Sequence, residues 1–413
     1  CGMEQGADLY ENQEIPVNPG LIDYVFITHA HIDHSGLLPL LYRKGFRGQV
    51  FATKATTELC NIMLKDSAHI QEAEAEWKNR KAKRAGNEQV VPMYTVDDAT
   101  AVIKHFIPCP YDTMIKVNDQ ITICFRDAGH LLGSAFIEIF ATEGNETRKL
   151  IFSGDLGNGN RALIQDPETA DGCDYLIIES TYGDRLHDVP PDYATALSEV
   201  LKKTFSKGGN VVIPAFSVGR TQEMLYYLRR IKTEGMLPES LLDFEVYVDS
   251  PLSVEATTIF NKNVLSCFRE EDKELIASGV NPISFEGLKC SVSSDDSKAI
   301  NFINHPVVIL SASGMCEAGR IRHHLKHNLW RKECTILFVG YQCPGTLGFN
   351  LLNGAKELKL FGEPIDVKAE ILNLPGISGH ADKDHLINWV KAMEHKPSQI
   401  FVVHGEDQVT DDF

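Results

Sequence analysis

The sequence predicts an α/β protein of two domains, with the second inserted into the first. The chain has 413 residues, which is long for one domain, since about 150 residues per domain is the usual size. Short apolar stretches typical of buried strands alternate with longer stretches typical of helices. Hydrophobic residues make up 43% and charged residues 23% of the chain, as in ordinary globular domains.

Five predicted strands of the first domain lead to a residue that can bind a metal ion or a proton. These strands cover residues 24–28, 121–129, 149–154, 175–180 and 400–403, and they end at or beside His29, His130, Asp155, Glu179 and His404. Because ligand sites in α/β proteins form at the carboxyl ends of strands, we expect these side chains to share one site. Helices are expected between the strands, at residues 36–45, 55–81, 221–235 and 383–394.

The middle of the chain reads as a second α/β unit. Its predicted strands cover residues 208–216, 244–250, 305–314 and 333–341, and no linker rich in proline, glycine or serine separates it from its flanks. We therefore expect one domain from residues 1–182 and 365–413 and an inserted domain from residues 183–364.

The stretch "HAHIDH", residues 29–34, has the composition of a metal site. His29 and His31 can direct their rings at one ion, and Asp33 and His34 follow after a bend and can face a second ion. Imidazole and carboxylate donors without a thiolate suit a catalytic zinc that keeps a position open for water. Manganese or iron would accept the same donors.

The motif HxHxDH, followed in order by "DAGHLLGS" and "FSGDLG", resembles the metallo-β-lactamase superfamily. This resemblance implies an αββα sandwich, with His130 as the third ligand of a first zinc ion. It also implies that Asp155 bridges two zinc ions.

The similarity extends to the β-CASP branch, nucleases that insert a second domain into the lactamase fold. "LIIESTYGDR", "ISGHAD" and "VVHGE" resemble its motifs A, B and C at Glu179, His380 and His404, and "AFSVGRTQE", "VDSPLS", "SASGM" and "GYQCPGTLG" resemble segments of its insertion. The fold class expected is therefore a metallo-β-lactamase αββα sandwich with an inserted α/β β-CASP domain. The chain resembles in particular bacterial and archaeal relatives of the pre-mRNA 3′-end-processing endonuclease.

The resemblance implies two Zn²⁺ ions and a ribonuclease that hydrolyses RNA phosphodiester bonds by a two-metal mechanism. The first ion would take His29, His31, His130 and Asp155, and the second Asp33, His34, Asp155 and His404. His380 is the implied general acid, with Glu179 holding its other ring nitrogen, and Asp33 is counted with them as catalytic. A histidine at motif C implies RNA as the substrate, because the branch that works on DNA carries a valine-like residue there.

Three further stretches are candidates for phosphate contacts. "FSVGR" and "SASGM" offer hydroxyl, guanidinium and backbone N–H groups, with a structural turn as the alternative interpretation. Residues 319–332 are basic without an acid, and the alternative there is a solvated helix face. The candidate residues are Ser217, Arg220, Ser313, Gly314, Arg320, Arg322 and Lys326.

Composition limits the partners. The balance of 40 basic and 57 acidic residues gives a net charge of −17, so nucleic acid must be bound through local positive charge. The ten cysteines form no CxxC pair, which predicts reduced thiols in a cytoplasmic protein, and no membrane span is expected. We expect RNA in the cleft between the two domains and no membrane partner. A homodimer is an open alternative for the oligomeric state.

Two departures from the family pattern and two alternative functions remain. The chain starts at Cys1 without the aspartate of the family's first motif, and both ends are expected to be truncated. Phe349 and Asn350 stand where many relatives carry arginine.

The alternative functions are a lactamase-fold hydrolase acting on DNA or on a small ester or thioester, and a non-catalytic RNA-binding β-CASP subunit. Such subunits typically lose metal ligands, whereas the later motifs here keep theirs.

Overall fold

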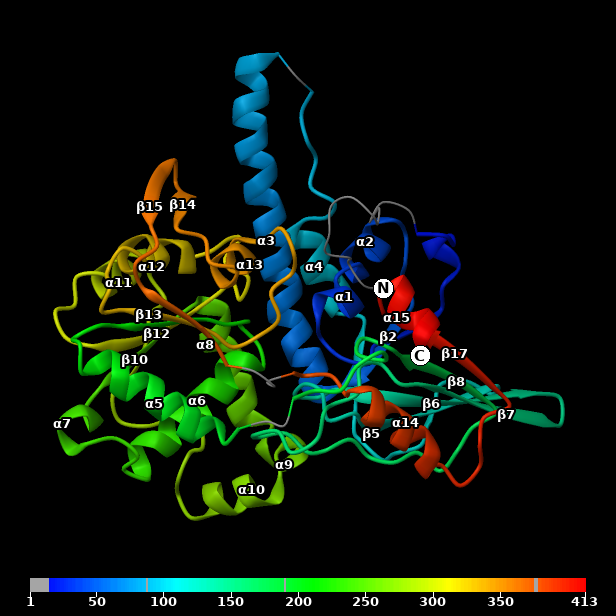
Figure 1. The fold of residues 1–413 in the computed structure, drawn as a ribbon. Coiled ribbons are helices and arrows are strands. Elements are labelled where there is room, and N and C mark those ends of the chain that lie inside the picture. Colours follow the sequence, from blue (N-terminus) through cyan, green and yellow to red (C-terminus); the bar gives the residue numbers. More distant parts are fainter. Residues whose placement is uncertain (1–14, 87, 189–190, 375–377) are drawn as a thin grey trace. The chain divides into compact units, whose positions relative to one another are not determined.

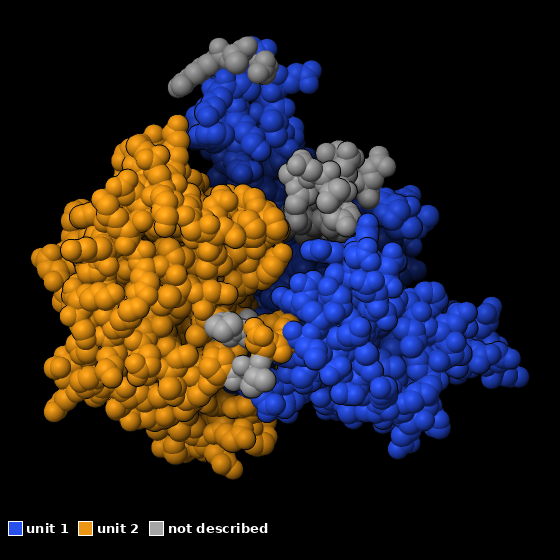
Figure 2. Space-filling view, viewed as in Figure 1, with its two compact units in different colours: residues 1–186, 379–413 blue, residues 187–378 orange. Residues whose placement is uncertain are grey.

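The computed structural model describes residues 15–86, 88–188, 191–374 and 378–413 (Figure 1). Contacts divide the chain into unit 1, residues 1–186 and 379–413, and unit 2, residues 187–378 (Figure 2). Cys1 and Gly2, on which the expectation about the first motif depends, lie outside the described residues. Within the described part, no helix has the length and apolar character needed to cross a membrane.

Unit 1 contains two sheets that face each other. The smaller sheet has the order β1 (Tyr24–Phe26), β2 (Gln49–Thr53), β3 (Phe106–Cys109). The larger has the order β17 (Gln399–Val403), β8 (Tyr175–Glu179), β7 (Glu146–Phe152), β6 (Ala135–Glu143), β5 (Ile121–Asp127), β4 (Ile115–Lys116). Phe51 of the smaller sheet packs with Ile123, Phe125 and Ile137 of the larger one in a shared apolar core.

Helices cover the outer faces of both sheets. On the larger sheet, Leu386 and Trp389 pack against Phe136, Ile151 and Leu176. The smaller sheet is covered by α3, which contacts β2 and β3. The αββα sandwich is thereby confirmed. The helices of unit 1 are α1 (Ile32–Ser35), α2 (Leu38–Arg43), α3 (Lys54–Ala85), α4 (Val96–Ile103), α14 (Lys383–Ala392) and α15 (Asp407–Asp412), with a 3₁₀ turn at Pro19–Leu21.

Unit 2 is built on a parallel sheet. Its order is β11 (Leu288–Cys290), β10 (Glu245–Asp249), β12 (Val307–Ser311), β9 (Val211–Pro214), β13 (Thr335–Phe338), β16 (Glu370–Asn373). Every residue of β9, β12 and β13 is buried, as expected where helices cover both faces of a parallel sheet. The helices of unit 2 are α5 (Tyr193–Phe205), α6 (Arg220–Thr233), α7 (Glu239–Leu242), α8 (Pro251–Lys262), α9 (Val264–Cys267), α10 (Glu270–Ala277), α11 (Ser294–Ile300), α12 (Ile321–Asn328) and α13 (Leu347–Leu352).

The last part of unit 2 in the sequence contains a hairpin and one further strand, before the chain continues into unit 1. The hairpin joins β14 (Glu357–Leu360) to β15 (Glu363–Asp366). The strand after it, β16, pairs in parallel with β13, so residues 370–373 belong by contact to the sheet of unit 2. The units are a division by contacts, and the domain limits at residues 182 and 364 stay a prediction.

Candidate metal centre

The predicted metal ligands converge at the carboxyl ends of strands in unit 1. His29 lies beyond β1, Asp155 beyond β7 and His404 directly after β17, while α1 carries Asp33 and His34. The ligand atoms form two groups, and within each group they all lie within 4.8 Å of one another. The first group is His29, His31, His130 and Asp155, and the second is Asp33, His34, Asp155 and His404.

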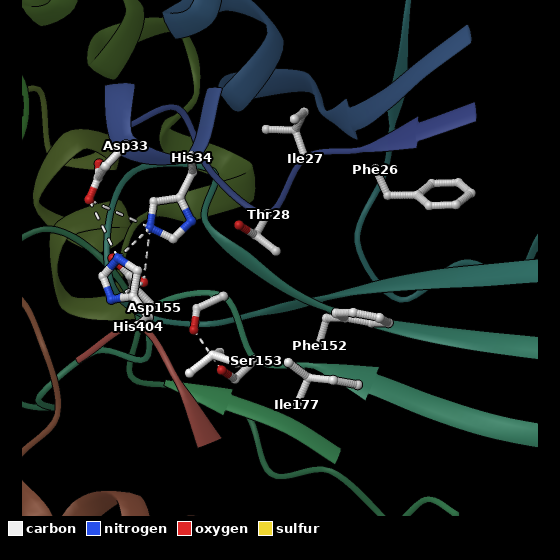
Figure 3. Close-up of a pocket in the computed structure, with 12 residues that line it drawn as sticks. Phe26, Ile27, Thr28, Asp33, His34, Phe152, Ser153, Asp155, Ile177 and His404 are labelled. Atoms are coloured by element: carbon white, nitrogen blue, oxygen red, sulfur yellow. Dashed lines mark hydrogen bonds and ion pairs between the residues drawn. The ribbon is translucent and has the colours of Figure 1, made fainter. Parts of the chain in front are cut away.

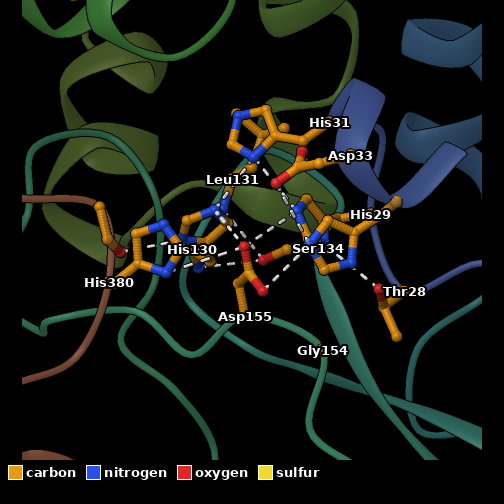
Figure 4. A network of polar contacts seen from close by, with 12 residues as sticks. Thr28, His29, His31, Asp33, His130, Leu131, Ser134, Gly154, Asp155 and His380 are labelled. Carbon is orange, nitrogen blue, oxygen red and sulfur yellow. Dashed lines mark hydrogen bonds and ion pairs between the residues drawn. The ribbon is translucent and has the colours of Figure 1, made fainter. Parts of the chain in front are cut away.

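In the first group, three imidazole rings surround one carboxylate oxygen (Figure 4). Nδ1 of His31 lies 3.1 Å from Nε2 of His29 and 3.1 Å from Nε2 of His130. Oδ2 of Asp155 lies 3.4 Å from Nε2 of His29 and 3.5 Å from Nε2 of His130. Ring nitrogens this close to one another and to a carboxylate form a donor set suited to one cation.

The second group surrounds the other oxygen of Asp155 (Figure 3). Oδ1 of Asp155 lies 3.2 Å from Nε2 of His34, which in turn lies 3.0 Å from Nε2 of His404. Oδ2 of Asp33 lies 3.7 Å from His34 and 3.5 Å from His404. Two imidazoles and two carboxylates therefore meet at this second position.

Asp155 links the two groups through a buried carboxylate. Its side chain is 1% exposed, and neither oxygen has a hydrogen-bond partner among the described residues. A buried charge without hydrogen bonds costs several kcal/mol unless an opposite charge compensates it, on the order of the desolvation penalty of an ion. The described donors thus fit a metal-binding site, with one oxygen of Asp155 facing each donor group.

The backbone at Gly154 allows this carboxylate to reach the histidines. Gly154 adopts a φ of 54°, and a Cβ added there would lie 2.7 Å from Cβ of Thr28. Only glycine accommodates both the left-handed conformation and the close approach. The loop after β7 can therefore lie against the end of β1 and bring Asp155 to His29.

Most ligand rings are held in place by a partner at the other ring nitrogen. Nδ1 of His130 lies 2.9 Å from the Gly379 carbonyl oxygen. Nδ1 of His404 lies 3.0 Å from Oγ1 of Thr181, and Nδ1 of His29 lies 3.2 Å from Oγ1 of Thr28. Such partners fix the tautomer and orientation of a metal-binding histidine.

The electrostatics of the first group favour neutral rings and a charged carboxylate. Burial, aided by charge on neighbouring imidazoles, lowers the pKa of His29 and His130 and lowers the pKa of His31 to about 3. Burial would raise the pKa of Asp155, but the imidazoles of His34 and His29 outweigh it and hold that pKa well below its usual range. Neutral imidazole and ionised carboxylate are the forms that bind metal ions.

His404 is the exception. Burial would lower its pKa, but the hydrogen bond to Asp33 and the charge of Asp155 raise the pKa to about 9. The protonated ring offsets the two carboxylates of the second group. A bound cation would provide that compensation instead and favour the neutral ring.

A third group places His380 beside Glu179. Nδ1 of His380 lies 3.1 Å from Oε2 of Glu179 and 3.7 Å from Oδ2 of Asp155. Burial would lower the pKa of His380, but the charges of Glu179 and then Asp155 outweigh it and raise the pKa. Glu179 is itself fixed, since its Oε1 accepts from the backbone N–H of Leu156 at 2.6 Å. The predicted pairing of His380 with Glu179 is present in the geometry.

A pocket of about 400 Å³ adjoins the second group (Figure 3). Asp33, His34, Asp155 and His404 line its polar side. The rest of its lining is largely apolar and includes Phe26, Ile27, Phe152, Ile177 and Val403. Apolar walls beside the ligands lower the local dielectric constant and strengthen the electrostatic interactions there.

The candidate phosphate contacts lie in unit 2. Ser217 follows β9, and Ser313 and Gly314 follow β12, so all three stand at the carboxyl edge of the parallel sheet. Arg220 begins α6 and pairs with Glu223 at 2.6 Å, with its side chain 10% exposed.

The three basic residues at α12 each have a partner within unit 2. Arg320 donates to buried Asp249 at 2.8 Å, and Lys326 pairs with Glu363 at 2.8 Å. Arg322 donates to the Glu317 carbonyl oxygen at 3.1 Å. Their positive charge is thus partly committed to the fold.

Several positioning groups were missed by the sequence reasoning. They are Thr28, Thr181 and the Gly379 carbonyl, which contact ligand rings, and Arg161, which donates to the His130 carbonyl oxygen at 2.5 Å. Thr28 and Thr181 stand within two residues of a predicted functional residue, and that proximity was a usable signal. Gly379 directly precedes His380 and has the same proximity, although its contact is made by the backbone. Arg161 has no comparable signal.

Family models match most of the chain. A metallo-beta-lactamase superfamily domain matches residues 2–156, a Beta-Casp domain residues 221–351, and a Zn-dependent metallo-hydrolase RNA specificity domain residues 364–413. The three models follow the chain in the order that the motifs predict.

Curated relatives match over nearly the full chain. Ribonuclease TTHA0252 of Thermus thermophilus is 35% identical over 410 residues, covering 99% of this chain and 87% of the relative. Transcription termination factor FttA of Methanocaldococcus jannaschii is 33% identical over 405 residues, covering 95% of this chain and 60% of the relative. FttA of Methanosarcina mazei is 32% identical, and the match covers 63% of its length. The chain thus spans less than two thirds of these two FttA proteins.

The motifs, the sandwich with its second α/β unit and the convergent donor groups agree with these matches. The chain belongs to the β-CASP family of the metallo-β-lactamase superfamily and is a metal-dependent hydrolase.

Proposed function

We propose that the protein is a zinc-dependent ribonuclease that hydrolyses RNA phosphodiester bonds with two metal ions. The observation that carries the proposal is the buried carboxylate of Asp155, which lies between two groups of imidazole and carboxylate donors. The relatives support the choice of substrate, since one is named a ribonuclease and a matching domain model is described as an RNA specificity domain.

The donors suit zinc, because they are imidazoles and carboxylates. His29, His31 and His130 would hold one ion, Asp33, His34 and His404 the other, and Asp155 would bridge them. When bound, a pair of divalent ions supplies a nucleophile at neutral pH and neutralises charge that develops on the phosphate oxygens. Manganese and iron accept the same donors, so the identity of the metal is part of the proposal.

His380 is proposed to protonate the leaving alkoxide. It is partly exposed, and the pairing with Glu179 raises its pKa and directs its other ring nitrogen away from that carboxylate. A positioned acid of this kind speeds bond breaking by about 10²- to 10⁴-fold. Asp33, the most exposed of the ligands, contributes its charge on the open side of the second group.

Contacts with the RNA backbone are assigned to unit 2. Hydroxyl and backbone N–H groups at Ser217, Ser313 and Gly314 can donate to phosphate oxygens. Arg322 and Lys326 are proposed as charge contacts, since the acidic partner of Lys326, Glu363, is exposed. Arg220 and Arg320 are proposed as weaker contacts, because their acidic partners are buried. The position of the RNA between the domains, a homodimer and a cytoplasmic location stay predictions.

Two alternatives are kept as outcomes of one experiment. The holo protein is incubated with end-labelled RNA and with DNA of matched sequence, each with a free or a blocked 5′ end, and product ends are mapped. We expect RNA to be cleaved well and DNA poorly, because contacts to the 2′-hydroxyl select ribose. Equal or faster cleavage of DNA would reject RNA specificity, and no cleavage of either polymer by metal-loaded protein would favour a small-ester hydrolase or a non-catalytic subunit.

The same experiment defines the mode of cleavage. Internal cuts that are insensitive to the 5′ end identify an endonuclease. Loss of cleavage on blocking the 5′ end identifies a 5′-exonuclease. The Asp155→Asn variant is the control for contaminating nuclease, because it removes the charge that both metal positions require.

A further inference from the structure

The distal end of α3 carries a concentrated positive charge. The stretch "WKNRKAKR", residues 77–84, contains five basic residues and no acidic one. The whole chain, by contrast, has a net charge of −17. We refer to Trp77, Lys78, Arg80, Lys81 and Lys83 as the α3 patch.

The side chains of the α3 patch are open to solvent. All five residues are exposed, and Trp77 retains 51% of its surface. An exposed tryptophan is uncommon and calls for an explanation when it stands among cations. Figure 2 shows the distal part of α3 as a projection of unit 1. The patch is therefore accessible on the surface of this unit.

The patch is also ordered. Lys81 places its ammonium group 3.5 Å from the centre of the Trp77 ring. Asn79 donates from Nδ2 to the Val90 carbonyl oxygen at 2.9 Å and accepts from the Val90 N–H at 2.7 Å. These two bonds fasten the returning chain to the helix beside the patch. The cations are thus displayed on a helix whose end is fixed to its own return segment.

Little of this charge is neutralised within the protein. Lys78 pairs with Glu74 at 3.5 Å, but both side chains are at least half exposed, and such pairs contribute about 0–1 kcal/mol. Among the described residues, no ion pair involves Arg80, Lys81 or Lys83. In contrast, Arg320, Lys326 and Arg331 of the basic stretch near α12 each pair with an acid. The α3 patch therefore has more positive charge available to a partner than the paired residues of the basic stretch near α12.

We propose that the α3 patch is an accessory contact for single-stranded RNA, in which the cations bind phosphates and Trp77 stacks on a base. This rests on the proposed ribonuclease function. Neutralising phosphates releases counterions, and stacking on an aromatic ring adds affinity without a requirement for sequence. Trp77 and Lys81 are four residues apart on the helix, so one face offers both a ring and a cation. An acidic protein would need only positive charge for binding. The exposed aromatic ring beside the cations therefore favours nucleic acid as the partner.

The first test measures RNA binding by a neutralised variant. Lys78→Gln, Arg80→Gln and Lys81→Gln are combined in a His380→Ala background, which limits cleavage while the metal-loaded protein is kept. We expect the Kd for a 40-nucleotide RNA to rise about tenfold at 0.1 M salt, and the slope of log K against log salt to flatten by about 1 to 2. A variant with Lys116→Gln, Arg148→Gln and Lys298→Gln changes the net charge equally at exposed sites elsewhere and should bind as the parent does.

The second test uses the fluorescence of Trp77. The chain has three tryptophans, of which Trp389 is buried. In a Trp330→Phe protein, RNA is expected to quench the emission, and the added change Trp77→Phe should abolish the quenching. Quenching that persists without Trp77, or an unchanged Kd and salt slope in the neutralised variant, would overturn the proposal. Poly-glutamate serves as the probe for an acidic protein. If the neutralised variant lost affinity for poly-glutamate but kept its affinity for RNA, the proposal would also be overturned, and the patch would be assigned to an acidic protein.

The outcomes separate this inference from the proposed function. The neutralised variant with His380 intact should cleave a short RNA with the kcat of the unmodified protein, because the patch contains no metal ligand or proton donor. Weakened RNA binding together with no cleavage by the unmodified protein would reject the nuclease and leave the RNA contact standing. Normal cleavage with unchanged binding would reject the contact alone.

Discussion

At the residue scale, His380 offers the sharpest separation of proton transfer from metal binding. His380→Ala should lower kcat by about 10²- to 10⁴-fold and leave the metal content unchanged, because His380 faces Glu179 and lies outside both ligand groups. The alkaline limb of the pH–rate profile should also disappear, since a general acid with a raised pKa loses its proton as the pH rises through that value. The measurements are single-turnover kinetics and metal analysis.

A control for this variant is available on the neighbouring helix. His385 on α14 is more than half exposed and contacts Asp382, so His385→Ala should leave kcat unchanged. Metal loss in His380→Ala protein would move His380 into the ligand set and contradict the assignment.

Asp249 in unit 2 gives a prediction about stability. Its buried carboxylate contacts Nε2 of His324 at 2.6 Å, Oγ of Ser297 at 2.6 Å and Arg320 at 2.8 Å. Burial would raise its pKa, but the hydrogen bonds from His324, Ser297 and Arg320 lower the pKa to about 2. Asp249→Asn should lower the free energy of unfolding by about 3 to 5 kcal/mol at pH 7, because it breaks a buried ion pair with Arg320 and removes the charged acceptor of the other two hydrogen bonds.

The pH dependence of this effect follows from the lowered pKa. The carboxylate of Asp249 stabilises the folded state fully above the pKa of an unfolded aspartate, about 3.9, and loses this contribution as the pH falls towards 2. Urea unfolding at pH 7, 4 and 2.5 should show the difference between the two proteins shrinking only below about pH 4. A difference that stays constant down to pH 2.5 would show that the charge of Asp249 is not responsible.

Individual ligands could be predicted from the sequence because motif residues follow strand ends directly. The groups that orient them could not, since those contacts join distant parts of the chain. Gly379 lies 249 positions from His130, and its carbonyl acts through the backbone, which no side-chain pattern records. The identity and roles of the ligands stay predictions, although the structure brings all seven together.

At the element scale, the start of α3 is tied to the loop that carries His130. Oγ1 of Thr53 caps the helix by accepting from the Thr56 N–H at 3.2 Å, and it donates to the Gly133 carbonyl oxygen at 2.6 Å. Thr53→Val should destabilise unit 1 by about 1 to 2 kcal/mol and weaken metal binding, because the His130 loop loses a support. Thermal unfolding and metal titration measure the two effects.

A threonine one helical turn further along the chain supplies the matched comparison. Thr57 donates to the Thr53 carbonyl oxygen at 3.0 Å, whereas its side chain makes no hydrogen bond to the described residues of the His130 loop. Thr57→Val should therefore leave metal affinity unchanged. If both variants lost metal affinity equally, the cause would be a less stable helix and not the loss of the contact with the His130 loop.

The elements that were predicted best are those with a strong local pattern. The helix expected at residues 55–81 is α3, Lys54–Ala85, and the strands expected at residues 175–180 and 400–403 are β8 and β17. Pairing of β16 with β13 could not be read from the sequence, because one short strand carries no information about its neighbour. The ion pairs of the basic stretch near α12 could not be predicted, since their acidic partners lie in other segments of the chain.

At the scale of the whole molecule, metal binding should stabilise unit 1 selectively. All ligands belong to unit 1, so chelation should lower the midpoint of its unfolding, whereas unit 2 should respond little. A ligand at 100 times its Kd adds about 2.7 kcal/mol per site. Trp389 reports on unit 1 and Trp330 on unit 2, which allows fluorescence to follow each during heating with zinc and with chelator. Equal shifts of both midpoints would argue against a centre confined to unit 1.

The return of the chain to unit 1 has a consequence for the timing of its synthesis. A growing chain folds from its amino-terminal end, and unit 2 is made before β17 can pair with β8. The first donor group is complete once Asp155 has emerged, but the second must wait for His404, which follows unit 2 in the chain. The order of translation itself therefore delays the second donor group until unit 2 has been synthesised.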